Sequence, residues 1–283
     1  MTSPVVGLPH PLVGGAFDSP VSPGSGWPEE PADASTPVAQ STSDVQRLAG
    51  GARDLGEIDA AVSVCRACPR LVDWRETVAH EKRRSFAAQP YWGRPISGWG
   101  STNPSVLVVG LAPAAHGGNR TGRIFTGDRS GDWLYGALHR AGLAESPTSD
   151  HAGDGQRLIA TRMLAAVKCA PPDNRPSTEE RDTCSGWLDA ELRLLLPTVR
   201  VVVCLGSFGW GVLLQALTRQ GYPVPRPRPA FGHGARVELQ DKAREPLVVL
   251  GCYHPSQQNT FTRKLTVPML DAVIGEAARF AIP

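Results

Sequence analysis

Residues 106–128 read VLVVGLAPAAHGGNRTGRIFTGD, a short apolar run followed at once by a polar segment rich in glycine. The run Val106–Gly110 has the continuous apolar character of a strand that is buried on both faces. The glycines that follow let the backbone approach a ligand closely. Neither G-K-[ST] nor G-x-G-x-x-G is present, so the segment is neither a P-loop nor a dinucleotide fingerprint. The stretch predicts a buried strand that ends in a ligand-binding loop.

The same alternation of strand and helix continues along the chain. Apolar runs predict three more strands, at residues 163–168, 199–205 and 247–252. Periodic segments predict helices over residues 59–77, 131–141, 178–196, 209–219 and 263–281. Ser177 and Glu180 form a capping-box pattern at the start of one of them. We therefore expect an α/β fold with four parallel strands and helices on both faces.

Two further polar segments follow predicted strands, CAPPDNR at 169–175 and YHPSQQNTFTRKLT at 253–266. Ligands of open parallel sheets bind beyond the carboxyl ends of the strands. The three loops are therefore expected to converge on one crevice.

Three residues in these loops are candidates for chemistry. Asp128 is the only carboxylate of the first loop, and it is a candidate for orienting or deprotonating water, or for capping the helix that follows. Asn174 presents an amide that reads both a donor and an acceptor, or it is a turn residue. His254 is a candidate for stabilising negative charge or carrying a proton, or it is structural.

Other residues of the loops suit a flat, anionic ligand. Phe125 is a stacking ring or a core residue, and Arg120 and Arg123 contact phosphate or are solvated. The polar residues 256–260, with Arg263 and Lys264 after them, suit a nucleic-acid groove or backbone, or they cap the last helix.

The six cysteines divide into two groups. Cys204 and Cys252 lie within predicted strands and are expected to be buried. Cys65, Cys68, Cys169 and Cys184 lie outside strands, and four thiolates suit zinc or an iron–sulfur cluster. Cys65 and Cys68 alone also fit a redox C-x-x-C pair, and composition does not decide between these possibilities.

The first 50 residues differ from the rest in composition. They are rich in Pro, Ser and Gly and carry a net charge of −4, which leaves about +6 on residues 51–283. This composition predicts a disordered tail, residues 1–50, before one folded domain. A basic body permits binding to a polyanion without requiring it. No apolar stretch is long enough to span a membrane and no secretory signal is visible, so we expect a cytoplasmic protein without disulfides.

The runs GLAPAAHGGNRTGRIFTGD and HPSQQNTFTRKLT, with KCAPPDNRP and the cysteine set, resemble family 5 (type B) of the uracil-DNA glycosylases. The resemblance covers the chain from about Cys65 to its end and makes residues 51–283 a glycosylase domain. It implies a three-layer α/β/α fold around a four-stranded parallel sheet. It also implies a [4Fe–4S] cluster of structural role on Cys65, Cys68, Cys169 and Cys184.

The activity that the resemblance implies is hydrolysis of the N-glycosidic bond of uracil in DNA. Hypoxanthine, xanthine and ethenocytosine are expected as further substrates, excised from double-stranded DNA by base flipping. The expected partner is therefore DNA that contains uracil or deaminated purines, bound by a monomer at the nucleoid.

The resemblance also assigns roles to individual residues. Asp128, Asn174 and His254 match catalytic positions, and the substrate-binding set is Gly110, Ala112, Phe125, Asn174 and His254. The expected DNA-binding residues are Arg120, Gln258, Asn259, Arg263 and Lys264. Related families carry a catalytic acid where this chain has Leu111 or Ala112, so the water-activating role is expected to pass to Asp128.

Two alternatives accompany this interpretation. A relative that cross-links to an abasic sugar carries a KRRIH-like loop, but here the KRR of residues 82–84 precedes the first motif, and we interpret it as a solvated basic stretch. A non-catalytic metal-cluster protein that binds DNA explains the cysteines and the basic body, but not three converging loops.

Overall fold

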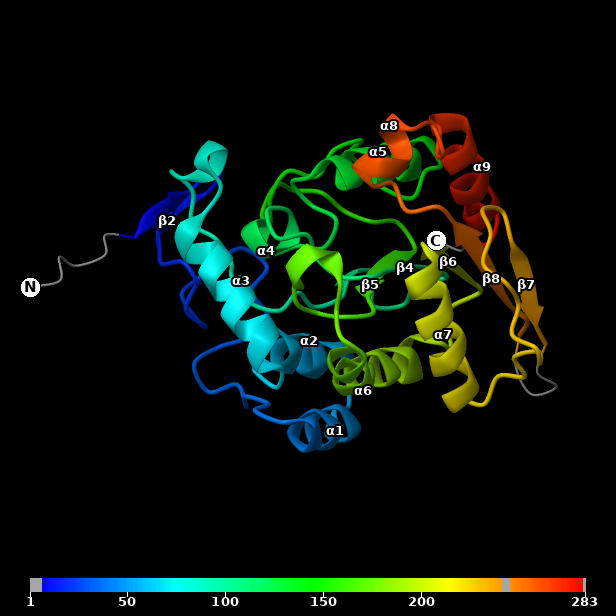
Figure 1. Ribbon diagram of the computed structural model, residues 1–283, viewed down its shortest axis with the longest axis horizontal. Helices are drawn as coiled ribbons and strands as arrows, with labels where there is room; N and C mark the ends of the chain where they lie inside the picture. The colour runs from blue at the N-terminus through cyan, green and yellow to red at the C-terminus, as the bar shows by residue number, and fades with distance from the viewer. Residues whose placement is uncertain (1–6, 241–244, 282–283) are drawn as a thin grey trace, which may run out of the picture.

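The computed structural model describes residues 7–240 and 245–281, and a mixed sheet lies at its centre (Figure 1). The strand order is β3-β5-β4-β6-β8-β7. The inner strands β5 (Thr161–Ala165), β4 (Val106–Gly110), β6 (Val201–Leu205) and β8 (Leu247–Cys252) are parallel. The four predicted strands are therefore confirmed, with the second starting two residues earlier than expected.

The sheet is larger than predicted because each edge carries a short antiparallel strand. These are β3 (Trp99–Gly100) and β7 (Arg236–Leu239). Neither has an apolar run, since β3 is two residues long and β7 is partly exposed. The expectation of a purely parallel four-stranded sheet is corrected at both edges.

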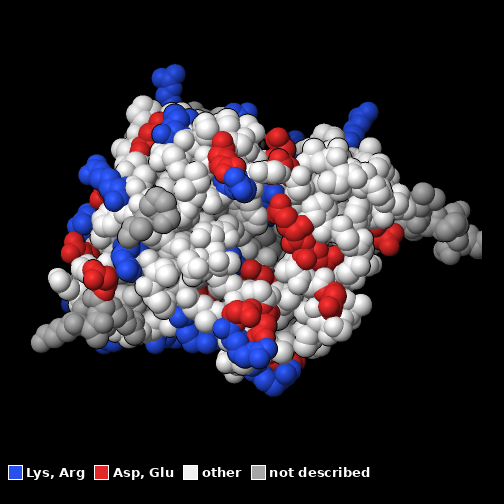
Figure 2. Space-filling model, turned by 180° about the vertical axis from the view of Figure 1, so that it is seen from behind, with Lys and Arg blue, Asp and Glu red and all other residues white. Residues whose placement is uncertain are grey.

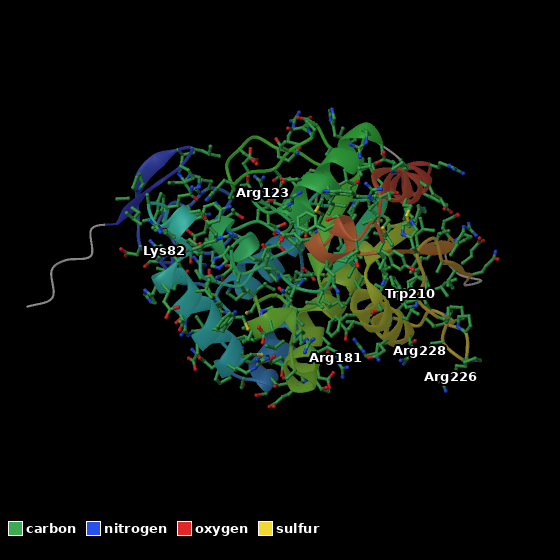
Figure 3. All side chains as sticks on the ribbon, turned by 45° about the horizontal axis from the view of Figure 1, so that its top comes forward. Lys82, Arg123, Arg181, Trp210, Arg226 and Arg228 are labelled. Carbon is green, nitrogen blue, oxygen red and sulfur yellow. The ribbon has the colours of Figure 1, made fainter. Side chains whose placement is uncertain are left out.

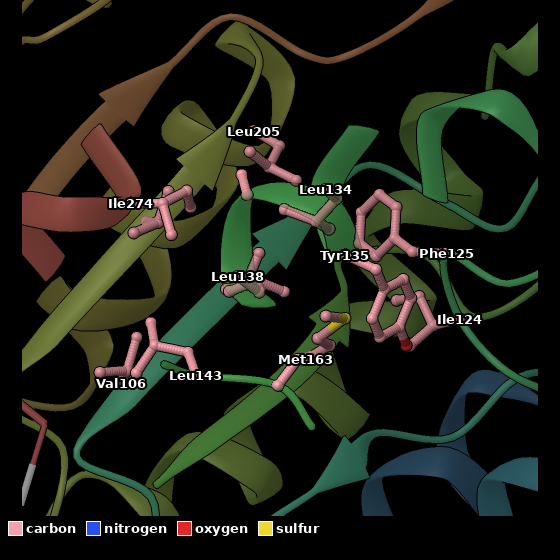
Figure 4. Packing of buried hydrophobic residues seen from close by; sticks show 14 of the residues in the cluster. Val106, Ile124, Phe125, Leu134, Tyr135, Leu138, Leu143, Met163, Leu205 and Ile274 are labelled. Carbon is pink, nitrogen blue, oxygen red and sulfur yellow. The ribbon is translucent and has the colours of Figure 1, made fainter. Parts of the chain in front are cut away.

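Helices cover both faces of the sheet, as predicted. On one face α5 (Arg129–Arg140) and α9 (Val267–Ala278) pack against Val106 and Val108. On the other, α6 (Thr178–Leu195) and α7 (Ser207–Arg219) pack against Leu107 and Val109. Figure 4 shows the first of these two cores, with Leu134, Leu138 and Ile274 among its members. Alternate residues of each inner strand thus fill opposite cores of a three-layer α/β/α fold.

Two predicted helices differ from the structure. The single helix expected over residues 59–77 is two helices, α2 (Leu55–Ser63) and α3 (Pro69–Glu81). Pro69 occupies the first position of α3, where its missing N–H costs nothing, so the chain turns between the helices, and Cys65 and Cys68 lie partly buried in this turn. The last helix begins at Val267, capped by Thr266, and a short helix α8 (Gln257–Phe261) precedes it.

Residues 7–50 are not the disordered tail that their composition predicts. They form a hairpin of β1 (Leu8–His10) and β2 (Gly14–Phe17), an extended segment and α1 (Thr42–Gly51). Trp27 is 3% exposed and Val45 is fully buried, each against the body of the protein. The segment has few apolar residues, but they pack on the domain as well as on one another, which composition does not reveal.

The carboxyl ends of the parallel strands lie side by side, as the prediction of a shared site requires. Gly110 pairs with Ala165, and Leu205 pairs with Cys252. The three loops start from this edge. The first contains the short helix α4 (Gly118–Thr121) and the second contains the 3-10 helix η2 (Pro172–Asn174). Another 3-10 helix, η1 (Arg84–Phe86), follows α3. Within the described residues, no helix is long and apolar enough to cross a membrane.

Candidate active site

Asp128 caps a helix, which is one of the two roles that the sequence left open. Its Oδ1 accepts the N–H of Gly131 at 2.9 Å, so it caps α5. Its Oδ2 lies against Gly117, where a Cβ would stand 2.1 Å from that oxygen. Burial raises the pKa of the carboxyl group, and the backbone N–H groups of Gly131 and Ser130 oppose this rise. One oxygen is therefore committed to the helix, and the other faces the first loop.

A cavity of about 730 Å³ brings Asp128 together with Asn174 and Gln257. Ala114 and Ala115 of the first loop form part of its wall. The three loops predicted to converge thus all contribute to one cavity, each through at least one side chain.

Asn174 is held in an unusual backbone conformation at the cavity rim. Its φ is +54° and that of Asp173 is +52°, at the end of η2. Such conformations cost energy for residues other than glycine and cluster at functional sites. The exposed amide is therefore positioned by the loop rather than by side-chain partners.

A second group of predicted residues lies beside the cavity. The ring of Phe125 covers Gly110, where a Cβ would stand 2.5 Å from the ring, and only glycine allows this contact. The Phe125 and His254 rings are 6.1 Å apart between centroids. Gly131 connects this group to Asp128. Its N–H donates to the Asp128 carboxylate, and a Cβ at this position would stand 2.1 Å from the Phe125 carbonyl oxygen.

His254 is largely enclosed, and this fixes its charge. Burial lowers its pKa to about 4, so the imidazole is neutral at neutral pH. Its carbonyl accepts the side-chain N–H of Asn259 at 2.9 Å. His254 is therefore suited to donate a hydrogen bond from a neutral ring, not to present a positive charge.

Arg120, predicted to contact DNA, is instead an internal brace of the first loop. It is 5% exposed, and its three nitrogen atoms donate to the His116 carbonyl, the Gln89 side chain and the Gly127 carbonyl. Its guanidinium also stacks on Phe86 at 4.0 Å. Gln89 and Phe86 lie in a distant segment, so the sequence did not reveal that this arginine points inward.

Arg123 is buried as well and ties the loop to the N-terminal segment (Figure 3). It pairs with Glu29 and Asp154, and Trp99 donates to the same Glu29 carboxylate. Glu29, from the first 50 positions, thus neutralises a buried arginine of the domain. Glu30 does the same for Arg94.

The four other predicted DNA-binding residues lie in or next to α8. Gln258, Arg263 and Lys264 are exposed, and Lys264 lies over the Tyr253 ring at 4.9 Å. Asn259 uses its side-chain N–H on His254, so it supports the loop internally. Phe261 is 63% exposed, and Arg129 lies over its ring at 4.9 Å.

The four candidate ligand cysteines line one small cavity, together with Arg75 and Lys168. Cys65 and Cys68 come from the turn before α3, Cys169 from the loop after β5, and Cys184 from α6. Burial, with a contribution from neighbouring cysteines, raises the pKa of Cys68 to about 12. Among the described residues, no group of three or more His, Cys, Asp or Glu side chains is arranged to hold a metal ion.

Arg75 gives this cavity a buried positive charge. It is 1% exposed, and it donates to the Cys169 sulfur at 2.9 Å and to the Cys65 carbonyl at 3.1 Å. Within the described residues its one ion pair is with Glu76, at 3.8 Å, and Glu76 is already bound by Arg66. Four thiolates and an undercompensated cation fit an anionic iron–sulfur cluster.

The sequence interpretation missed several residues of the cavity wall. His116 lines the cavity and its Nδ1 lies 3.1 Å from the Tyr91 hydroxyl. Arg83, from the basic stretch interpreted as solvated, is exposed and also lines the wall. His116 stands inside the quoted first motif, which is the one signal that pointed to it.

The comparisons with known proteins agree with this geometry. Residues 97–277 match the family model of the uracil DNA glycosylase superfamily. A type-5 uracil-DNA glycosylase of Mycobacterium tuberculosis (strain CDC 1551 / Oshkosh) is 58% identical over 272 residues, 96% of this chain and 98% of that protein. That of Mycobacterium leprae (strain TN) is 56% identical over 83% of this chain and 99% of its own. That of Thermus thermophilus is 46% identical over 78% and 95%. The chain belongs to the type-5 uracil-DNA glycosylases, an enzyme family of hydrolases.

Proposed function

We propose that this protein excises uracil and other deaminated bases from double-stranded DNA by hydrolysing the N-glycosidic bond. The observation that carries the proposal is the Asp128 carboxylate, whose Oδ1 caps α5 and whose Oδ2 faces the first loop, on the wall of a cavity that Asn174 also lines. The relatives' name, uracil-DNA glycosylase, supplies the base that we expect first.

Recognition begins with a base that leaves the duplex and enters the site. Unstacking a base costs a few kcal/mol, least for a mispaired one, which favours deaminated bases. The amide of Asn174 matches the donor and acceptor on a uracil edge. The Phe125 ring, which packs over Gly110, supplies a face on which the base stacks, with Ala112 leaving room beside it.

Hydrolysis transfers a hydroxyl group from water to C1′ of the sugar. The C1′–N bond breaks with its electron pair on the base, which leaves an oxocarbenium-like sugar. Water adds to C1′, and Asp128 accepts the proton that this water loses. With alanine and leucine at the position of the acid in related families, a largely dissociative path suits the site.

The departing base carries the negative charge, and His254 is placed to stabilise it. A neutral imidazole donates one N–H to the anion, as preorganised donors do in other sites of developing charge. The base anion then takes a proton from solvent, and Asp128 releases its proton to solvent, which completes the balance of the reaction.

The cavity walls favour a broad range of bases. Ala114 and Ala115 present only methyl groups, and the volume of about 730 Å³ exceeds the need of a pyrimidine alone. We therefore extend the proposal to hypoxanthine, xanthine and ethenocytosine.

The cysteine site is proposed to hold a [4Fe–4S] cluster through Cys65, Cys68, Cys169 and Cys184. The cluster would serve as scaffold, tying the turn before α3 to α6 and to the loop after β5. Arg75 would offset its negative charge.

The DNA is proposed to lie across α8. Arg263 and Lys264 offer phosphate contacts, and Gln258 with the exposed Phe261 would help to hold the duplex open. On the opposite face from Figure 1, acidic and basic side chains are interspersed (Figure 2). Charge therefore does not single out that face. We propose that the protein acts as a monomer on chromosomal DNA.

A single-turnover assay tests the proposal. Labelled duplexes that contain uracil, hypoxanthine, xanthine or ethenocytosine are incubated with the protein, and abasic products are cleaved with alkali. We expect excision of uracil and of at least one purine. Binding without excision of any base would instead support a non-catalytic protein, and a denaturant-stable adduct would support the cross-linking alternative.

A further inference from the structure

The tip of the N-terminal hairpin lies on the wall of the candidate active site. Pro11 and Leu12 line the same cavity as Asp128 and Asn174. Leu12 is 51% exposed and Val13 is 56% exposed. The family model begins at residue 97, so this hairpin lies outside it.

The tip is held in one conformation by buried rings beneath it. The backbone N–H groups of Leu12 and Val13 both donate to His10 Nδ1, at 3.2 and 3.3 Å. The His10 ring is 2% exposed and packs edge-on against Trp27 and His151, with centroids 4.6 and 4.2 Å apart. The backbone that carries these two exposed apolar side chains is thus fixed at the surface.

The segment that follows the hairpin is also anchored to the first loop. The Trp27 ring covers Gly122, where a Cβ would stand 2.6 Å from the indole nitrogen. Glu29 pairs with Arg123 of the same loop. The position of the tip relative to Asp128 is therefore defined by buried contacts on both sides of the loop.

Basic and acidic residues both line the cavity that the tip borders. Arg83 lines the cavity, and Arg84 follows it at the start of η1. Figures 1 and 3 show the hairpin next to this end of α3, where Lys82 is labelled. Asp132 and Asp150 line the same cavity, and Asp150 precedes His151, which packs on His10 of the hairpin. Apolar side chains flanked by arginine suit a nucleic-acid strand. The apolar side chains pack on bases and sugars, and the arginines pair with phosphates.

We propose that Leu12 and Val13 contact the DNA strand that carries the lesion, on the opposite wall of the cavity from α8. This inference rests on the proposed function for the identity of the ligand. The tip packs against the sugar and base of a nucleotide next to the extruded one, while Arg83 and Arg84 hold its phosphates. The N-terminal segment is then part of the substrate-binding surface.

Binding to a duplex with a tetrahydrofuran abasic-site analogue, measured by fluorescence anisotropy, tests the contact independently of catalysis. For the double variant Leu12→Ser/Val13→Ser we expect binding about tenfold weaker, the loss of part of one buried leucine. Val38→Ser is the matched control, because Val38 is 39% exposed and does not line the cavity.

A second variant keeps the test decisive if the serine variant folds poorly. Leu12→Lys adds a positive charge at the tip, so the dependence of affinity on salt should steepen by about one ion. Unchanged affinity in the serine variant, or an unchanged salt slope in Leu12→Lys, would overturn the inference. A wild-type protein that binds the analogue but excises no uracil would overturn the proposed function and leave the contact standing.

Discussion

Asp128→Asn separates the structural role of this residue from its chemical role. Asparagine caps a helix about as well as aspartate, so the bond to the Gly131 N–H is retained. The variant loses only the negative charge, which lies on a group whose pKa is raised by burial. We therefore expect its thermal unfolding to match that of the wild type or to shift slightly upward.

The expected loss of activity follows from the position of the second carboxylate oxygen. A positioned general base contributes roughly 10²–10⁴-fold to a rate. Because the path proposed here is largely dissociative, water is activated late, and we expect a loss near the lower limit, about 10²-fold or 2.7 kcal/mol. Asp128→Ala should lose the same factor and also about 1 kcal/mol of stability with the cap, which lowers Tm by roughly 2–4 °C.

The pH dependence gives a further check on Asp128. A general base works deprotonated, so the rate is present above its pKa in the folded protein and is lost as the pH falls through that value. Since burial raises this pKa, the acid limb of the wild-type profile should lie above the ordinary aspartate value of 3.8. Single-turnover excision across pH measures it, and the limb should be lost in Asp128→Asn. Wild-type excision rates in Asp128→Asn would refute the reasoning.

Other perturbations test the remaining parts of the site. Gly117→Ala should lower excision as Asp128→Asn does, because the new Cβ displaces Oδ2; a wild-type single-turnover rate would contradict this. His254→Ala should lose about 10²-fold in excision rate. The free energy of unfolding of the wild type should also fall as the pH drops from 6.5 to about 4, because the unfolded chain protonates His254 at a higher pH than the folded protein does. Urea unfolding of His254→Ala should lack this part of the pH dependence. Arg75→Gln should yield a protein with less iron and faster bleaching of its brown colour in air, whereas Arg66→Gln, on the exposed side of the same Glu76, should not.

The sequence was sufficient for the centre of the fold and for the convergence of the loops. Four apolar runs are long enough to be recognised, and parallel topology places their carboxyl ends together. The edge strands β3 and β7 were missed because a two-residue strand and a half-exposed one leave no periodic signal. The capping box of α6 was predicted correctly, since Ser177 and Glu180 act within one turn.

The direction of individual side chains could not be predicted in the same way. Arg120 is an arginine in a glycine-rich loop, and nothing nearby in sequence reveals that Gln89 and Phe86 enclose it. The order of residues 7–50 has the same origin, because their burial depends on partners such as Gly122 and Arg123 rather than on their own composition. For Asp128 the sequence posed capping and catalysis as alternatives, and the two oxygens make them compatible.

The cysteine site and the catalytic loop are connected by a single buried residue. The Arg75 guanidinium donates to Cys169, and its backbone carbonyl accepts the Asn119 side-chain N–H at 3.1 Å. Asn119 belongs to α4, within the loop that carries Asp128. A cluster that fixes Arg75 therefore also fixes the backbone from which the loop starts. The proposed cluster would therefore contribute by holding the loop in place, which needs no electron transfer.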